Sequence, residues 1–465
     1  MSTGTTQLKV FCENHPALIL YEDKESLCLV VMSPPSSEDI NQLTFTCQKK
    51  IAIKSVSREE FLTSQQAATI PHPLQTEYKG EDNPTTIDYC QTILRHAVQQ
   101  KASDIHIDPH AQGAKIRLRV DGVLYVYGEL TSVETTAISS RFKLLAGVDI
   151  AENRRPQDGQ LSLLDQEINY SFRLATLPTK FGEKVVLRLL ETFRGDLQLE
   201  NIGMPPAQLA IFKTALAAPQ GLIIVAGPTG SGKTATLYSA LNSLNREERN
   251  LCSVEDPIEL VIPGINQTQI NLKAGLDFPT ILRALLRQDP DILMIGEIRD
   301  NQTADIAIKA AQTGHLVLST LHTNSPLDTL SRLTQMGVAE YLTASAVKLI
   351  VAQRLVRRLC QQCRLSSPDP LPAHLALPSH QHWLAVGCPS CLYGYMGRHA
   401  LFELLPVDAA IKEAIIKKTS TQNIRARLQE SNLDTLFKAG LYAVMKGITT
   451  YQELLRVVGT DNEAA

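Results

Sequence analysis

Short runs of apolar residues alternate with stretches of helical periodicity between residues 205 and 355. The runs GLIIVA (221–226), ILMI (292–295) and LVLST (316–320) read as buried strands. Strands that are apolar throughout and separated by helices are the layout of a parallel sheet covered by helices on its faces. The pattern therefore predicts the α/β class, with a mostly parallel sheet, for this part of the chain.

A different pattern precedes this region. The stretch IDYCQTILRHAVQQKA (87–102) has apolar residues at helical spacing. Four runs then alternate between apolar and polar residues, and turn signals such as Asp-Gly separate them: SDIHIDP, KIRLRVDGVLYVYGEL, INYSFRLATLP and EKVVLRLLE. This order predicts a sheet-rich α+β domain that opens with a helix.

The two ends of the chain carry weaker patterns. Near the N-terminus, LCLVVMSPP predicts a short strand that ends at prolines, and SSEDINQLTFTC predicts a helix. The predicted organisation is a small N-terminal α+β domain (1–70), a Pro-rich and polar linker (71–86), the sheet-rich domain (87–203), the parallel α/β domain (204–355), a segment with four paired cysteines (356–404) and a helical C-terminal part (405–465).

Composition and charge narrow the function classes. With 44% hydrophobic and 20% charged residues, the chain resembles globular proteins rather than disordered or fibrous ones. The net charge of −3 means that the chain lacks the overall positive charge that favours binding to nucleic acid. No apolar run approaches the roughly 18 residues that span a bilayer, and the first residues lack the layout of a signal peptide. We therefore expect no transmembrane segment and a cytoplasmic location.

The strongest chemical signal is the sequence GPTGSGKT, which follows the first buried run and precedes a helical stretch. It fits the phosphate-binding pattern Gly-x-x-x-x-Gly-Lys-Thr, in which glycines let backbone N–H groups wrap around phosphate oxygens. Lys233 would reach the β- and γ-phosphates of ATP, and Thr234 would bind Mg²⁺. The predicted nucleotide contacts are Gly227, Pro228, Thr229, Gly230, Ser231, Gly232, Lys233 and Thr234.

Carboxylates near the ends of neighbouring strands are candidates for activating water. Glu297 follows the run 292–295 and is preceded by Gly296, where many nucleotide hydrolases carry an Asp. We expect Glu297 to position or deprotonate the attacking water. Glu255 and Asp256, in SVEDPIE, are further metal or water contacts, and the sequence does not rank Glu255 against Glu297 as the base.

Two histidines flank the run LVLST. Ligands of parallel sheets lie at the carboxyl ends of the strands, so His322, which follows the run, is the better placed to sense the γ-phosphate. His315 precedes the run and is a second candidate for contact with the nucleotide.

Four of the nine cysteines form two Cys-x-x-Cys pairs, and the odd remainder argues against a secreted disulfide framework. The pairs are suited to one structural Zn²⁺ held by four thiolates, although the gap between them is slightly longer than in most zinc ribbons. A redox pair or free thiols are the alternatives. The predicted zinc ligands are Cys360, Cys363, Cys388 and Cys391, and three histidines, at 374, 380 and 382, lie in the intervening loop.

Four stretches in one order resemble the successive boxes of the bacterial secretion and pilus-assembly ATPases, the superfamily of type II secretion, type IV pilus and competence motors: GPTGSGKTATLYSAL, SVEDPIE, LRALLRQDPDILMIGEIRD and AAQTGHLVLSTLHTN. Flanking segments such as ASDIHIDP and GYMGRHALFELLPV extend the resemblance over almost the whole chain. It implies a RecA-like P-loop domain and ATP hydrolysis by a homo-oligomer, a six-membered ring. The ring would power pilin or pseudopilin assembly against an inner-membrane platform protein, as a cytoplasmic ATPase peripherally associated with the inner membrane.

The resemblance also implies roles for particular residues of the sheet-rich domain. Arg173 and Arg188 match arginines that approach the phosphates when that domain closes over the nucleotide. Read without the family, they are ordinary surface charges on strands. Gln160 departs from the family, which usually has Arg at this position. The tetracysteine insert and the N-terminal domain are features of assembly and secretion motors rather than of retraction motors.

Two other functions stay open on the sequence. The basic run RLVRRLC (354–360) would suit a motor that moves along nucleic acid, which the net charge of −3 and the single Trp disfavour. A non-hydrolysing P-loop interaction subunit is disfavoured by the intact Lys233, Thr234 and Glu297. The sequence does not distinguish protein secretion, pilus assembly and DNA uptake.

Overall fold

The computed structural model describes residues 17–22, 26–31, 35–47, 50–55, 86–190, 197–367, 370–375, 381–419, 424 and 434–460. These residues divide between two units. The first unit comprises Met1–Leu189, Leu359–Pro368 and Leu384–Met396, and the second comprises Leu190–Arg358, Asp369–Trp383 and Gly397–Ala465. The linker predicted for residues 71–86 lies outside the described residues, except for its last position.

A seven-stranded sheet forms the centre of the second unit. Its strands lie in the order β12-β11-β13-β14-β10-β15-β18, and the pairings from β12 to β15 are parallel. The strands are β10 (Gly221–Ala226), β11 (Leu251–Glu255), β12 (Asn266–Gln269), β13 (Ile292–Ile295), β14 (Leu316–Leu321), β15 (Val347–Leu359) and β18 (Tyr395–Pro406). The predicted mostly parallel sheet is therefore confirmed, as is its RecA-like class.

Helices cover both faces of this sheet, which explains why its central strands are apolar throughout. Along β10, Leu222 and Ile224 pack in a cluster with α9 and α10, whereas Ile223 and Val225 pack in a second cluster with α7 and α8. The helical elements are η1 (Leu199–Ile202), α7 (Pro206–Leu216), α8 (Lys233–Leu244), η2 (Leu272–Ala274), α9 (Phe278–Leu285), α10 (Asn301–Gln312), α11 (Pro326–Gln335), α12 (Glu340–Ala346) and α13 (Ala409–Ile416).

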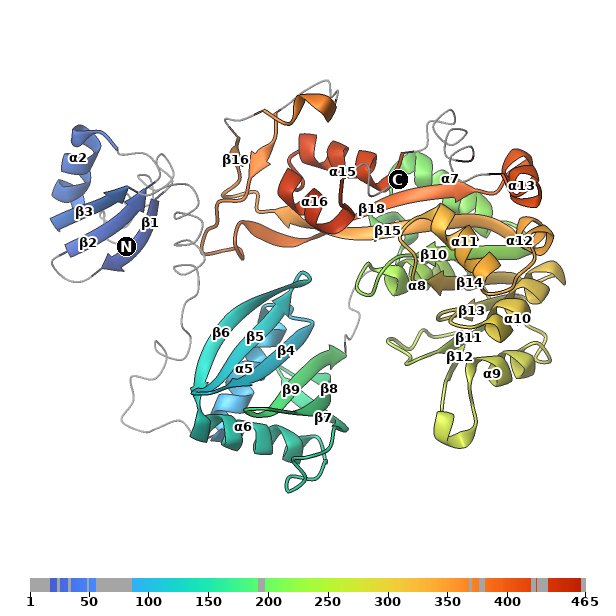
Figure 1. Cartoon of the computed structure of the whole chain (residues 1–465), viewed down its shortest axis with the longest axis horizontal. Coiled ribbons are helices and arrows are strands. Elements are labelled where there is room, and N and C mark those ends of the chain that lie inside the picture. The colour runs from blue at the N-terminus through green and yellow to red at the C-terminus, as the bar shows by residue number, and fades with distance from the viewer. Residues whose placement is uncertain are drawn as a thin grey trace. The chain divides into compact units, whose positions relative to one another are not determined.

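Two strands carry the sheet beyond residue 355, where the sequence pattern placed the end of the α/β domain. β15 continues to Leu359, and β18, which follows the cysteine pairs, lies beside it as the edge strand (Figure 1). Two C-terminal helices, α15 (Leu436–Met445) and α16 (Tyr451–Val458), pack against apolar residues of both strands. The cysteine pairs thus interrupt the sheet rather than follow it. The helices expected between residues 405 and 457 are α13, α15 and α16 in the described part.

The sheet-rich part of the first unit has the order β6-β5-β4-β9-β8-β7. Its apolar face packs against two helices in one buried cluster, while charged residues alternate onto the other face. The elements are α5 (Thr86–Gln99), β4 (Asp104–His110), β5 (Gly113–Val120), β6 (Val123–Thr131), α6 (Ser132–Leu145), β7 (Gln157–Asp165), β8 (Ile168–Thr179) and β9 (Gly182–Leu190). The alternation read from the sequence is therefore present in the structure.

The described residues between 17 and 55 form a small three-stranded sheet with one helix, whereas the sequence pattern predicted one strand and one helix there. Its elements are β1 (Ala17–Glu22), β2 (Ser26–Val31), α2 (Ser37–Cys47) and β3 (Lys50–Ser55). The short elements β16 (Leu365–Ser366), η3 (Ala373–Leu375) and β17 (Trp383–Leu384) lie between the two cysteine pairs. Within the part of the chain that the structure describes, no helix is both long enough and apolar enough to cross a membrane.

Candidate functional site

The loop between β10 and α8 has the backbone that a phosphate-binding loop requires. Gly227 and Gly232 have φ angles of 155° and 87°, in the region that favours glycine. A Cβ atom on Gly227 would also lie 2.5 Å from the Ser231 Oγ and 2.6 Å from the backbone oxygen of Gln353. The loop is therefore held in a shape that only glycine can adopt at these two positions.

Lys233, the first residue of α8, is folded back onto this loop. Its Nζ donates to the backbone oxygens of Gly227, at 2.7 Å, and Pro228, at 3.0 Å. The residue is 8% exposed, and burial lowers the pKa of its amine to about 8, a shift that the nearby charge of Glu297 opposes. The ammonium is thus held by neutral oxygens, which phosphate oxygens would replace.

Ser231 offers a second group suited to a phosphate. The residue is buried, and its Oγ has no hydrogen-bond partner among the described residues. A buried hydroxyl without a partner is costly unless a ligand completes its hydrogen bonding. This orphaned donor and the inward ammonium of Lys233 fit the polyphosphate of a nucleotide.

Glu297 lies at the carboxyl edge of the sheet, two residues after β13. Its carboxylate pairs with Arg299 and lies 3.2 Å from the Nε2 of His322, which follows β14. The guanidinium of Arg299 also lies 3.7 Å from an oxygen of Asp256, which follows β11. The side chain of Glu297 is 15% exposed, so it keeps access to solvent. Three neighbouring strands thus bring Glu297, His322 and Asp256 together at one edge.

Glu255, the last residue of β11, has a different environment, with only 3% of the residue exposed. Its carboxylate accepts hydrogen bonds from the Tyr238 hydroxyl, from Ser253 Oγ at 2.5 Å and from Gln267 Nε2 at 3.0 Å. Burial and the Glu255 carboxylate both raise the pKa of Tyr238, which keeps the phenol protonated as a donor. Because Tyr238 belongs to α8, Glu255 joins β11 to the helix of the phosphate loop.

The structure corrects the prediction for His315. This residue immediately precedes β14, and its backbone oxygen accepts a hydrogen bond from Gly221 at the start of β10. The phosphate loop leaves the other end of β10, about 20 Å away at roughly 3.3 Å per residue. His315 instead has its Nδ1 3.0 Å from the backbone oxygen of Ala310. It lies at the opposite edge of the sheet from the loop, because parallel strands all leave the sheet at one edge.

Arg173 and Arg188 lie in the first unit, on the face of its sheet opposite the apolar cluster. Arg188 is 63% exposed at its side chain and donates to Asp104 Oδ1 at 2.8 Å. Arg173 pairs with Asp158 at 3.2 Å. Gln160 stands directly opposite Arg173 in the antiparallel register of β7 and β8. Both arginines therefore present guanidinium groups on an open sheet face.

Sequence reasoning missed three side chains that support the phosphate loop and its edge: Arg299, Gln353 and Arg354. Arg299 stood in the stretch GEIRD, and its position two residues after Glu297 was an available signal. Arg354 was grouped with the basic run beside the cysteines. It is in fact buried, and it donates to Gln353 O at 3.0 Å and to both oxygens of Asn324. Only the packing of β15 beside β10 places Gln353 next to the loop.

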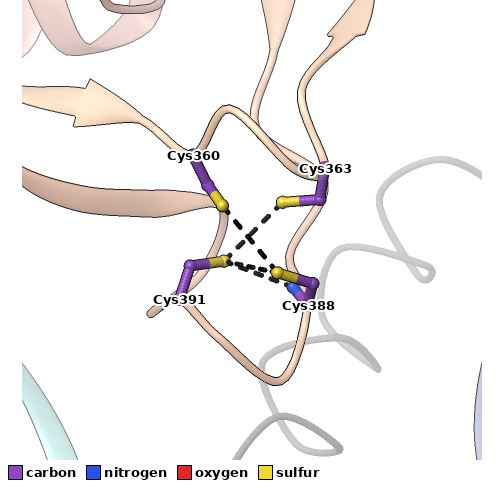
Figure 2. Close-up of side chains that lie close together, drawn as sticks. All are labelled: Cys360, Cys363, Cys388 and Cys391. Carbon is purple, nitrogen blue, oxygen red and sulfur yellow. Dashed lines mark hydrogen bonds between the residues drawn. The ribbon is translucent and has the colours of Figure 1, made fainter.

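The four paired cysteines form one cluster, in which all Sγ atoms lie within 4.8 Å of one another. Figure 2 shows the side chains of the two loops pointing toward a common centre. The Sγ atoms of Cys360 and Cys388 are 3.8 Å apart, and those of Cys363 and Cys391 are 3.6 Å apart. Four sulfurs around a zinc ion, with bonds of about 2.3 Å in a tetrahedron, would be separated by about 3.8 Å. The arrangement fits a closed site with no open position for a substrate.

Backbone groups further support the cysteine cluster. The N–H of Gly387 donates to Cys363 Sγ, and that of Cys388 donates to Cys391 Sγ, both at 3.3 Å. Such N–H donors stabilise thiolates. Of the remaining cysteines, Cys90 and Cys252 are buried free thiols, as expected for small apolar residues. The side chains at 374 and 380 lie outside the described residues, and His382 is not part of the cluster.

Comparison with known proteins agrees with this geometry. A family described as type II/IV secretion system protein matches residues 79–456. The chain is 47% identical to the protein transport protein HofB homolog of Escherichia coli K12, over 97% of this chain and 98% of that protein. It is 43% identical to the type IV pilus assembly ATPase PilB of Acinetobacter baylyi (82% and 67%) and 38% identical to the type II secretion system protein E of Klebsiella pneumoniae (96% and 95%).

Solved structures of related ATPases share the fold. The pilus retraction motor PilT with bound ADP is 25% identical and matches with a TM-score of 0.54, over 79% of this chain and 96% of that one. The Legionella pneumophila ATPase DotB, at 21% identity, matches with a TM-score of 0.60 over 80% and 96% of the two chains. At that identity the second likeness concerns the fold alone.

Proposed function

We propose that this chain, which belongs to the type II/IV secretion system protein family, is the ATPase that powers assembly of pilins or pseudopilins in a type IV pilus or a type II secretion system. The observation that carries the proposal is the convergence of Lys233, Glu297 and His322 at one edge of a RecA-like sheet. Relatives named as pilus assembly ATPases and as secretion proteins both match the chain over most of its length.

Each residue of this edge has a part in hydrolysis. Lys233 exchanges the oxygens of Gly227 and Pro228 for the β- and γ-phosphate oxygens, and Ser231 donates its free hydroxyl. Mg²⁺, held through Thr234, would neutralise phosphate charge when it is bound. Glu297 orients the attacking water and accepts its proton, because it retains solvent access, unlike the buried Glu255, and contacts His322.

The two carboxylates therefore take separate roles. Glu255 is occupied by three donors, so it holds β11 and α8 in place rather than acting on water. Arg299 forms ion pairs with both Glu297 and Asp256 and so holds the Glu297 side chain in place. His322 lies where a bound γ-phosphate would alter its contact with Glu297. ATP hydrolysis would then change the same contacts that join three strands.

The complete motor is a homo-oligomer, a hexameric ring by analogy with the family. Arg173 and Arg188 supply positive charge to the transferring phosphoryl group when the sheet-rich unit closes over nucleotide. The ring acts in the cytoplasm at the inner membrane, where it turns against the platform protein and so drives pilin or pseudopilin addition. The cysteine cluster holds Zn²⁺ as a structural ion between β15 and β18.

One observation weighs against a nucleic-acid motor. Of the basic run at 354–360, Arg354 is buried against Asn324, and Arg357 donates to the buried carboxylate of Glu453 at 2.8 Å. These two guanidinium groups are engaged inside the protein and would not meet a phosphate backbone.

The proposal is tested by phosphate release and by complementation. Purified protein should hydrolyse ATP with Mg²⁺ present, and Lys233→Ala should abolish the reaction. In a host whose relative of this gene is deleted, the wild-type gene should restore pilus formation or secretion, and the Lys233→Ala gene should not. Hydrolysis without restoration in either system would leave an ATPase with a different cargo and would contradict the proposal.

A further inference from the structure

Gln353 lies on β15 beside the first residue of the phosphate loop. In the parallel register of β10 and β15, Ala226 lies opposite Ala352, so Gln353 follows next to Gly227. The residue is only 3% exposed. Its Oε1 accepts a hydrogen bond of 2.7 Å from the Oγ1 of Thr236, in the first turn of α8. This buried bond joins a strand to the helix that carries the phosphate-binding residues.

The same residue contacts both ends of the loop. Its backbone oxygen lies 2.6 Å from the position of a Cβ on Gly227, and its side-chain Nε2 lies 2.8 Å from that of a Cβ on Gly232. Any side chain at either glycine would therefore collide with Gln353. Lys233 and Thr234 directly follow Gly232. The close contact between Gln353 and Gly232 therefore also limits where the backbone of these two residues can lie.

Gln353 is itself fixed by its neighbour Arg354. The guanidinium of Arg354 donates to the backbone oxygen of Gln353 at 3.0 Å, and to the backbone and side-chain oxygens of Asn324 at 3.1 and 3.0 Å. Asn324 lies two residues after His322. The backbone of Gln353 is thus tied to the segment that presents His322, while its side chain is tied to α8.

We propose that Gln353 is a positioning residue for ATP hydrolysis, which acts through Thr236 to fix the start of α8, and with it Lys233 and Thr234, against the carboxyl edge of the sheet. This inference rests on the proposed function, because it concerns the same nucleotide site. A misplacement of about 1 Å in a group that orients the substrate can reduce a rate by about 10²-fold. Loss of the buried bond should therefore lower turnover more than it lowers nucleotide affinity.

The test is a double-mutant cycle between the two bonded side chains. Gln353→Met keeps the length of the side chain without its acceptor, and Thr236→Val keeps the shape without the hydroxyl. Each should lower kcat by about tenfold or more and change the affinity for a fluorescent ATP analogue by less. If Gln353 and Thr236 act through the hydrogen bond between them, either substitution alone already removes that bond. The double variant should then be no slower than the slower single variant.

Two controls separate positioning from packing. Thr236→Ser retains the donor and should retain turnover, and Gln335→Met makes the same chemical change at an exposed position on α11. Should Gln353→Met fail to fold, the contrast between Thr236→Val and Thr236→Ser still decides. Losses that multiply in the double variant, or a kcat within about twofold of wild type in Thr236→Val, would overturn the inference. If the wild type binds nucleotide without hydrolysing it, the proposed function fails and the inference fails with it. If the wild type hydrolyses ATP and the variants behave otherwise than expected, the inference alone fails.

Discussion

The Nε2 of His322 lies 3.2 Å from a carboxylate oxygen of Glu297, although the two residues follow different strands of the sheet. This contact places a histidine beside a carboxylate that keeps access to solvent and whose charge acts on Lys233. Arg299 holds the other side of the same carboxylate. The pair therefore marks the point at which bound ATP and attacking water would meet.

The first prediction follows from the exposure of Glu297. Glu297→Gln should bind ATP with near-normal affinity and lower kcat by about 10²-fold or more, because the amide cannot accept the proton of the attacking water. Single-turnover phosphate release and a fluorescent-nucleotide titration measure the two quantities separately.

Glu255→Gln is the matched control. Its amide group would face donors that now point at a carboxylate, so the free energy of unfolding should fall by about 1–3 kcal/mol. Chemical denaturation would measure that loss. Should Glu297→Gln turn over normally while Glu255→Gln shows the large kinetic loss in folded protein, the roles assigned to the two carboxylates would have to be exchanged.

The second prediction concerns pH. In the nucleotide-free protein, burial lowers the pKa of Lys233 from 10.5 to about 8, while Glu297 opposes the shift and Arg354 adds to it. Bound phosphates favour the ammonium form, so ATP binding above about pH 8 requires proton uptake. Affinity should therefore fall as pH rises above about 8, by up to about tenfold per pH unit.

Folding stability should respond in the opposite direction. The unfolded chain holds the Lys233 proton up to its ordinary pKa, so between about pH 8 and 10.5 it binds more protons than the folded protein. The contribution of this residue to stability therefore rises with pH across that window.

The proton uptake on ATP binding can be counted by calorimetric titration of the protein with ATP in buffers of different ionisation enthalpy. ATP affinity that stays constant from about pH 7 to 9 would contradict the lowered pKa of Lys233.

The third prediction is that the cysteine cluster contains metal. Elemental analysis of protein purified without chelator should find about one zinc per chain. Cys388→Ser should lose the zinc and reduce protection from hydrogen exchange in residues 355–400, because a closed thiolate site contributes folding energy directly.

Cys252→Ser is the control for loss of a thiol as such, since Cys252 is buried in the sheet and does not belong to the cluster. It should retain the zinc. Protein that is fully folded and free of metal under reducing conditions would refute the zinc site and return the pairs to a redox or structural thiol role.

The fourth prediction is that ATP hydrolysis requires the assembled oligomer, in which Arg188 reaches the nucleotide. Arg188→Ala should lower kcat more than it lowers ATP affinity, because a guanidinium that neutralises the transferring phosphoryl group acts mainly in the transition state. Asp104 would keep its contacts with Ser103 and Arg119, so the variant should fold. Specific activity of the wild type should rise with protein concentration as subunits associate.

Arg95→Ala serves as the matched control, because Arg95 is a half-exposed arginine of the same unit that pairs with Asp165 at 3.4 Å. Its turnover should equal that of the wild type. A dilute monomer that hydrolyses ATP as fast per chain as a concentrated sample would favour a single-subunit nucleotide switch over a ring.

Much of the site could be read from contiguous sequence. The phosphate loop and the two cysteine pairs were identified because their chemistry depends on residues close together in the chain, whose spacing sets the backbone. The parallel sheet was predicted because strands covered on both faces leave apolar runs in the sequence. The prediction that Glu297 and His322 lie at the carboxyl edge of the sheet came by the same route, since each follows one of those runs.

Tertiary structure decided which way side chains at the same edge would face. Glu255 and Glu297 both come at the end of a buried strand, but Tyr238, Ser253 and Gln267 enclose only the first. Arg354 looked like a surface charge because the residues that surround it, such as Asn324, are distant in the sequence. His315 was misplaced because a histidine next to a strand does not by itself reveal which end of the sheet is used.

The position of β18 in the sheet and of Gln353 behind the phosphate loop was likewise settled by long-range pairing. The sequence by itself determined the fold class and the groups available for chemistry, because these depend on local spacing and on burial periodicity, and the resemblance of its motifs indicated the family. Exposure, hydrogen-bond partners and the division of labour between equivalent groups depend on which distant segments pack against them, and only the folded chain fixes that packing.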